Sequence, residues 1–211
     1  MALVTYTYVG YGVLLYLLVR IKRLLHKSGG CGNTAGDAGL PHVTFMVCAY
    51  NEQDVVDMKI ANTRALDYPR EKLHIVWVTD GSSDATNERL AKYDGVRVLY
   101  QPERKGKTAA LNRGLALAET SIVIMTDANT MVNKDAIRET VRLMADPKVG
   151  CVAGEKRVMT KSEGEIAAEG EGMYWKYESK LKSLDSELYS AMGAAGEYCA
   201  VRKELCRPMP E

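Results

Sequence analysis

Short apolar runs alternate with polar, helix-compatible segments from residue 42 onward, and this alternation limits the possible folds more than any other feature. The apolar runs are almost continuously hydrophobic, as strands are when helices cover both faces of a sheet. Alternating strands and helices predict right-handed βαβ units and a doubly wound, mostly parallel α/β sheet. The predicted strands are residues 43–49, 73–79, 96–100, 122–126 and 149–154, and the predicted helices are 52–66, 83–93, 107–117 and 134–145.

The alternation ends after residue 154. Residues 163–188 are rich in Glu, Lys and Ala and carry apolar side chains at helical spacing, which predicts one long amphipathic helix. A stretch of small residues, 191–196, follows this predicted helix.

The N-terminal segment differs from the rest of the chain in its apolarity. Residues 1–19 contain no charged side chain, and a helix of that length measures roughly 28 Å, close to the thickness of a hydrocarbon core. Basic residues follow at positions 20, 22, 23 and 27. By the positive-inside rule, we predict a single-pass transmembrane helix with a basic cytoplasmic flank in residues 1–27. A peripheral helix and a helix buried in the protein core are the alternatives.

A glycine-rich segment without large apolar residues separates this N-terminal segment from the alternating region. It predicts a flexible linker over residues 28–40, between the cell membrane and a cytoplasmic domain over 41–211. Four of the 28 Lys and Arg residues precede the linker, which leaves 24 basic against 27 acidic side chains. A mildly acidic domain of this kind does not favour nucleic-acid binding. The five cysteines form no metal-ligating or disulfide spacing, which agrees with a reducing compartment.

Polar residues follow three of the predicted strands at the points where those strands end. In an open α/β sheet, ligands bind beyond the carboxyl ends of the strands, so these loops are expected to meet. Each loop by itself could hold only helix caps and turn formers, but three at one edge favour a binding site. The loops are 49–52 (Ala-Tyr-Asn-Glu), 80–83 (Asp-Gly-Ser-Ser) and 127–129 (Asp-Ala-Asn).

The residue types in these loops suit a nucleoside diphosphate. A divalent cation stabilises a departing diphosphate, and Mg²⁺ or Mn²⁺ prefers hard oxygen ligands such as those of Asp127. Asp80, at the end of the neighbouring strand, is placed to accept hydrogen bonds from a base or ribose. Lys107 begins a predicted helix, where its charge and the helix end can bind phosphate; a solvated basic turn is the alternative. The segment is not a P-loop, because position 101 is Gln where that motif needs Gly.

Four motifs in this order resemble those of family 2 glycosyltransferases, which have the GT-A fold. They are CAYNE at 48–52, VTDGSSDAT at 78–86, RKGKTAALNRGL at 104–115 and MTDANT at 125–130. The resemblance runs from about residue 43 to 210 and is greatest to the membrane-bound processive branch, which includes hyaluronan, chitin and poly-N-acetylglucosamine synthases. The stretches WKYESKLKSLDSEL from residue 175 and GAAGEYCAVRKEL at 193–205 resemble the acceptor-side segment of the family.

The resemblance implies an inverting enzyme that transfers sugar from a nucleotide sugar, here a UDP-sugar, to a saccharide or lipid acceptor at the cytoplasmic membrane face. The implied donor-binding residues are Ala49, Tyr50, Glu52, Asp80, Lys107 and Asp127, the implied Mg²⁺ or Mn²⁺ ligands are Asp127 and Asn129, and the implied acceptor residues are Gly193 and Gly196.

Three departures from the family pattern bear on this prediction. Thr79 precedes Asp80 where the family often has a second acid, and Asn129 stands where many relatives have a carboxylate. The catalytic general base of the family, a Gln-Arg-Trp motif and further membrane helices are expected beyond Glu211, so we expect the domain to be C-terminally incomplete. A non-catalytic nucleotide-sugar-binding subunit and a nucleotidyltransferase are the alternative functions.

Overall fold

The computed structural model describes residues 6, 10–25, 37–155, 166–191, 193 and 196–210. The described residues fall into two compact units. One unit, within residues 31–154 and 195–211, contains the sheet; the other, within 1–30 and 155–194, contains two helices. Most of the predicted linker lies outside the described residues. The domain boundaries predicted from the sequence stay a prediction.

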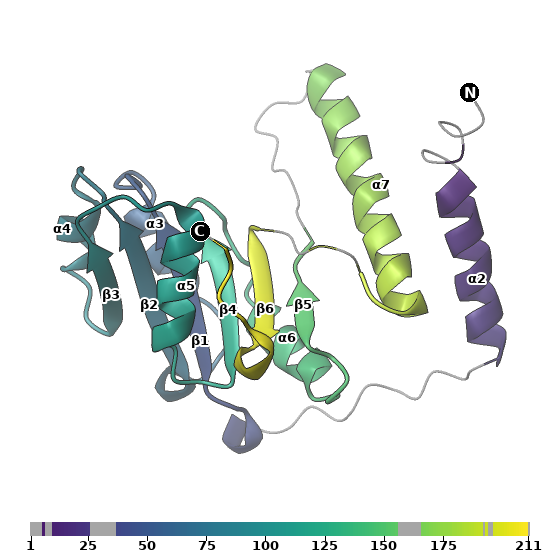
Figure 1. Cartoon of the computed structure of the whole chain (residues 1–211), viewed down its shortest axis with the longest axis horizontal. Helices are drawn as coiled ribbons and strands as arrows, with labels where there is room; N and C mark the ends of the chain where they lie inside the picture. Colours follow the sequence, from purple (N-terminus) through teal and green to yellow (C-terminus); the bar gives the residue numbers. More distant parts are fainter. Residues whose placement is uncertain are drawn as a thin grey trace. The chain divides into compact units, whose positions relative to one another are not determined.

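Within the described residues, six strands form one mixed sheet in the order β3-β2-β1-β4-β6-β5 (Figure 1). The four strands β1 to β4 are parallel, whereas β6 is antiparallel to both β4 and β5. The mostly parallel α/β sheet predicted from the sequence is therefore confirmed. The strand bounds are β1 Val43–Ala49, β2 Leu73–Asp80, β3 Val96–Gln101, β4 Ile122–Asp127, β5 Cys151–Ala153 and β6 Tyr198–Arg202.

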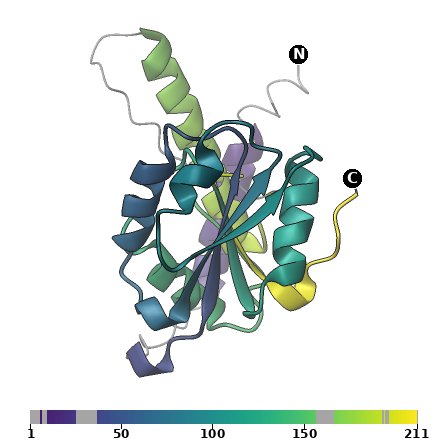
Figure 2. The same cartoon turned by 90° about the vertical axis from the view of Figure 1, so that its left-hand side faces the viewer.

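Helices cover both faces of this sheet, as Figure 2 shows for α3 in blue and α5 in teal. On β1, Phe45 points to the same face as α3, α4 and α6, whereas Met46 points to the face that α5 covers. Gly114 brings α5 close to the sheet, because a Cβ at this position would lie 2.0 Å from the sulfur of Met46. The helix bounds are α3 Val56–Arg64, α4 Thr86–Leu90, α5 Lys107–Leu117 and α6 Ala136–Met144, with 3₁₀ turns at Asp37–Gly39, Arg70–Lys72 and Lys203–Leu205.

The second unit is a pair of helices, α2 Tyr11–Leu25 and α7 Ile166–Leu188. Leu15 and Val19 of α2 are buried against Leu184 of α7. Lys22 Nζ donates to the carbonyls of residues 187 and 188, at the carboxyl end of α7, where a positive charge is electrostatically favourable. The long helix predicted over residues 163–188 is thus present in the described part of that segment.

The transmembrane helix predicted in residues 1–27 is not supported. No helix among the described residues is both long enough and apolar enough to cross a membrane. α2 has 15 residues, which at about 1.5 Å per residue gives about 22 Å, shorter than a hydrocarbon core of about 30 Å.

Candidate functional site

A cavity of about 310 Å³ lies where β1, β2 and β4 end, at the carboxyl edge of the parallel strands. The structure places seven residues that the sequence singled out around this one cavity. They are Ala49, Tyr50, Glu52, Asp80, Lys107, Asp127 and Asn129. The cavity also includes four residues for which no role was predicted from the sequence, namely Cys48, Arg104, Gly106 and Ala110.

Hydrogen bonds connect the loop after β1 to the loop after β2. The backbone N–H of Asn51 donates to Ser82 Oγ at 3.1 Å, and the side-chain oxygen of Asn51 accepts from the backbone N–H of Ser83 at 2.9 Å. Asn51 adopts a left-handed conformation with φ of 53°, which Asn tolerates better than most residues. In the described region 37–155, helices α3 to α6 begin without a hydrogen bond from their N-cap side chains. Asn51, Ser82 and Ser83 therefore join the two loops to each other.

Asp80 is almost fully buried at the end of β2, with 4% of its surface exposed. Its carboxylate accepts hydrogen bonds from the Lys105 N–H at 3.0 Å and the Gly106 N–H at 2.7 Å. The guanidinium of Arg113 lies 3.9 Å away. Asp80 thus holds the loop that leads into α5, an arrangement that the sequence did not indicate. Its predicted contact with a base or ribose stays a prediction.

Gly81 allows the loop before α5 to approach the end of β2. A Cβ at Gly81 would lie 2.6 Å from the backbone nitrogen of Arg104, and its φ of 68° disfavours other residues. The Arg104 guanidinium carbon lies 3.9 Å from the centroid of the Tyr50 ring. This cation–π contact at the cavity was missed because Arg104 and Tyr50 lie in separate motifs.

Lys107, the first residue of α5, extends to the end of β4. Its Nζ lies 2.6 Å from Asp127 Oδ1. The side chains are 54% and 31% exposed, so this ion pair contributes little to stability and can exchange for another partner. In this arrangement the ammonium of Lys107 occupies a position beside Asp127 where a divalent cation could compete for the same oxygen.

The acidic groups around the cavity repel one another. Burial raises the pKa of the Glu52 carboxyl, and the negative charges of Asp127 and Asp84 raise it further. A bound cation would relieve this repulsion. The thiol of Cys48 is different, because burial raises its pKa to about 12. It therefore stays protonated at neutral pH and is a poor nucleophile.

The donor set fits a hard divalent cation that is shared with a ligand. Asp127 and Asn129 offer a carboxylate and an amide oxygen at one cavity, which suits Mg²⁺ or Mn²⁺. No group of three or more His, Cys, Asp or Glu side chains in the described part of the chain could hold a metal ion by itself. The remaining ligands would therefore come from phosphate oxygens and water.

The two glycines of the predicted acceptor segment differ in position. A Cβ at Gly196 would lie 3.6 Å from Lys107 Nζ, so Gly196 is next to the cavity. Gly193, with a φ of 80°, belongs to the unit that contains α2 and α7. A role of either glycine in acceptor binding stays a prediction.

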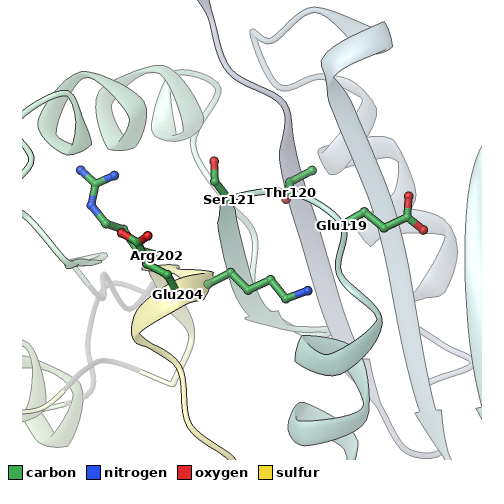
Figure 3. Close-up of a pocket in the computed structure, with 6 residues that line it drawn as sticks. Glu119, Thr120, Ser121, Arg202 and Glu204 are labelled. Carbon is green, nitrogen blue, oxygen red and sulfur yellow. The ribbon is translucent and has the colours of Figure 1, made fainter.

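A second cavity, of about 560 Å³, lies at the opposite edge of the sheet, at the start of β4 and the end of β6 (Figure 3). Its basic side chains already bind backbone carbonyls. Arg202 donates to the carbonyls of Met144, Asp146 and Val149, and Lys203 Nζ donates to that of Ala118. Both cations thereby stabilise helix carboxyl ends, so this cavity has a structural explanation despite its larger volume.

Comparison with known proteins matches most of this chain to one family. The family model described as glycosyl transferase family 2 matches residues 44–208. Poly-beta-1,6-N-acetyl-D-glucosamine synthase of Staphylococcus aureus is 38% identical over 128 residues, or 58% of this chain. The probable glycosyltransferase YdaM of Bacillus subtilis is 36% identical over 132 residues, or 59% of this chain. The chain spans 30% and 31% of the lengths of these two relatives.

Solved structures share the architecture of the sheet. The mannosyltransferase PcManGT from Pyrobaculum calidifontis, in complex with GDP-Man and Mn²⁺, is 29% identical to this chain, with a TM-score of 0.72. The match covers 95% of this chain and 55% of the mannosyltransferase chain. S. aureus TarS in complex with UDP-GlcNAc is 18% identical with a TM-score of 0.53, covering 59% of this chain and 37% of its own, and shares the fold. The resemblance noted in the sequence is thus confirmed: the chain belongs to glycosyl transferase family 2.

Proposed function

We propose that this chain is the donor-binding part of an inverting glycosyltransferase. It takes a sugar from a UDP-sugar and transfers it to a saccharide or lipid acceptor at the cytoplasmic face of a membrane. The observation that carries the proposal is the single cavity in which Asp127 and Asn129 lie together with Lys107 and Arg104. The 29% identity to a mannosyltransferase in complex with GDP-Man and Mn²⁺ supports a nucleotide-sugar donor and a divalent cation.

Five residues of the cavity have a part in this proposal. Asp127 and Asn129 would hold the cation, Mg²⁺ or Mn²⁺, which would supply positive charge to stabilise the diphosphate leaving group. Lys107 leaves Asp127 and binds a phosphate oxygen, aided by the positive amino end of α5. Tyr50, which stacks against Arg104, offers a flat surface to the base.

Calorimetric titration of the chain with UDP-sugars and GDP-sugars, each with Mn²⁺, tests this function. We expect UDP-GlcNAc to bind with a dissociation constant between about 1 μM and 1 mM, the usual range for enzyme substrates. Preference for GDP-Man would overturn the assignment of uridine, while leaving a nucleotide-sugar site. Binding of neither donor would overturn the proposed function itself.

The membrane location is supported by the surface of α2. Val13, Leu17 and Ile21 are about half exposed, and Arg20 of the same helix is also exposed. An apolar surface beside basic side chains suits the interface of an anionic membrane.

Co-sedimentation with vesicles of phosphatidylglycerol and phosphatidylcholine measures this association. We expect Leu17→Glu to reduce the bound fraction several-fold, because it places a charge where apolar contact is needed. Met58→Glu on α3 is the control, since Met58 is also about half exposed but lies in the other unit. Equal binding of the two variants would contradict the proposed location.

A further inference from the structure

Lys59 of α3 is fully buried, which is rare for a lysine. Its Nζ donates to Thr126 Oγ1 at 3.1 Å and to the carbonyl of Thr130, and it lies 5.5 Å from the centroid of the Phe45 ring. Burial lowers the pKa of Lys59 to about 8, and the negative charge of Asp127 opposes that shift. The ammonium form therefore predominates at neutral pH, and two of its three N–H donors have hydrogen-bond partners.

The two hydrogen-bond partners of Lys59 stand at opposite ends of one turn. Thr126 directly precedes Asp127, and Thr130 directly follows Asn129. The Thr130 N–H donates to the Asp127 carbonyl at 3.3 Å, which closes the turn. Thr126 Oγ1 donates onward to the Glu197 carbonyl at 2.8 Å, ahead of β6. One buried ammonium thus connects α3 to both ends of the turn that carries the candidate metal ligands.

Asn62 adds a second contact from the same face of α3, three residues after Lys59. Its side-chain amide donates to the Val132 carbonyl at 2.8 Å and accepts from the Val132 N–H at 2.9 Å. The segment from the end of β4 to α6 is irregular, so its backbone groups need partners outside a helix or sheet. α3 supplies several of them.

An apolar side chain could fill the volume of Lys59 without the desolvation of a charge. The distinctive contribution of Lys59 is therefore its set of directed N–H donors. We propose that Lys59 is a positioning residue that holds the 126–130 turn so that Asp127 and Asn129 present their oxygens to the cation and diphosphate. The role of the turn in binding the cation rests on the proposed function. The statement that Lys59 restrains the turn rests on the hydrogen bonds above.

Hydrogen–deuterium exchange of the nucleotide-free chain measures how strongly Lys59 restrains the 126–130 turn. We compare Lys59→Met, which keeps the length of the side chain but removes its donors, with Thr63→Val. Thr63 is equally buried on α3, but its hydroxyl donates to the Lys59 carbonyl and not to the turn. In Lys59→Met, the Thr130 amide should exchange roughly tenfold faster or more, whereas Thr63→Val should leave it within about twofold of wild type.

Calorimetry with UDP supplies the second readout. We expect Lys59→Met to weaken binding of UDP in Mn²⁺ on the order of tenfold. Binding of UDP in EDTA should be unchanged, because only the metal-dependent contribution to binding involves the turn. Thr63→Val should match wild type under both conditions. A general loss of stability in Lys59→Met would weaken UDP binding in Mn²⁺ and in EDTA alike, so a loss confined to Mn²⁺ separates positioning from a merely structural role.

The outcomes distinguish the inference from the proposed function. If wild type does not bind UDP with Mn²⁺, the proposed function fails, and exchange at Thr130 alone decides whether Lys59 holds the turn. If wild type binds but Lys59→Met equals Thr63→Val in both readouts, only the inference is overturned. If Lys59→Met does not fold, Thr126→Val takes its place, since it removes one acceptor of the Lys59 ammonium. No change in either readout for Thr126→Val would equally overturn it.

Discussion

We expect Asp127→Asn to bind UDP in the presence of Mn²⁺ on the order of 100-fold more weakly than wild type, a loss of about 2.8 kcal/mol. Asp127 is a carboxylate at the cavity whose side chain is 31% exposed, and it forms an ion pair with the exposed Lys107. Asparagine keeps the size of the side chain but replaces the charged oxygen that a hard divalent cation prefers. Calorimetric titration of both proteins measures the difference.

The control for this variant is Glu119→Gln. Glu119 also forms an exposed ion pair, 3.3 Å from Arg97, but it lies at the opposite edge of the sheet. Breaking an exposed pair changes stability by about 1 kcal/mol or less in either variant. If Glu119→Gln weakened UDP binding as much as Asp127→Asn does, Asp127 would not be a ligand of the cation. The same would follow if Asp127→Asn left UDP affinity unchanged.

Asp80→Asn is expected to lower the free energy of unfolding by about 2–3 kcal/mol, because a buried charged acceptor of backbone N–H groups is lost. In asparagine an NH₂ group replaces one of the carboxylate oxygens, and it cannot accept a hydrogen bond. The remaining neutral oxygen accepts more weakly than the carboxylate from the N–H groups of Lys105 and Gly106. For a chain of this size the melting temperature should fall by about 4–12 °C. Release of the loop before α5 should also weaken UDP binding, since that loop carries Arg104 and leads to Lys107.

Asp57→Asn is the matched control for Asp80→Asn. Asp57 pairs with Arg89 at 2.9 Å, but its side chain is 55% exposed. We expect it to lower the free energy of unfolding by no more than about 1 kcal/mol. Thermal unfolding followed by circular dichroism compares the two. An Asp80→Asn protein that melts together with wild type would show that Asp80 does not support the loop.

The parallel core of the fold could be predicted from the sequence because strands covered on both faces are continuously apolar. β1, β2 and β4 lie where these runs predict them, apart from one residue added to the ends of β2 and β4. The strand β6 was missed. It is short, follows a stretch of small residues and pairs antiparallel with β4, so no strand–helix alternation marks it. Helix ends were also less predictable, since α4 has 5 residues where 83–93 was predicted.

The set of cavity residues could be predicted because carboxyl ends of parallel strands meet at one edge. What each side chain contacts could not, since those contacts join distant segments. The burial of Asp80 depends on N–H groups 25 and 26 residues later in the chain. Lys59 lies in a polar helix, and no sequence pattern shows that its ammonium reaches a turn 67 residues away.

The N-terminal prediction was the least successful, for a physical reason. Lack of charge over residues 1–19 indicated a membrane span, but lack of charge does not separate a spanning helix from one that packs against a partner helix. In the described structure α2 begins at Tyr11 and buries Leu15 and Val19 against α7.

The proposed function requires that the turn at the end of β4 bind a nucleoside diphosphate through a divalent cation. Titration of UDP into the wild-type chain, with Mn²⁺ and again with EDTA, measures whether it does. We predict that binding in Mn²⁺ is at least about tenfold tighter than in EDTA, and that Asp127→Asn abolishes this difference. Equal UDP affinity in Mn²⁺ and EDTA, or a metal-dependent difference that persists in Asp127→Asn, would contradict the claim.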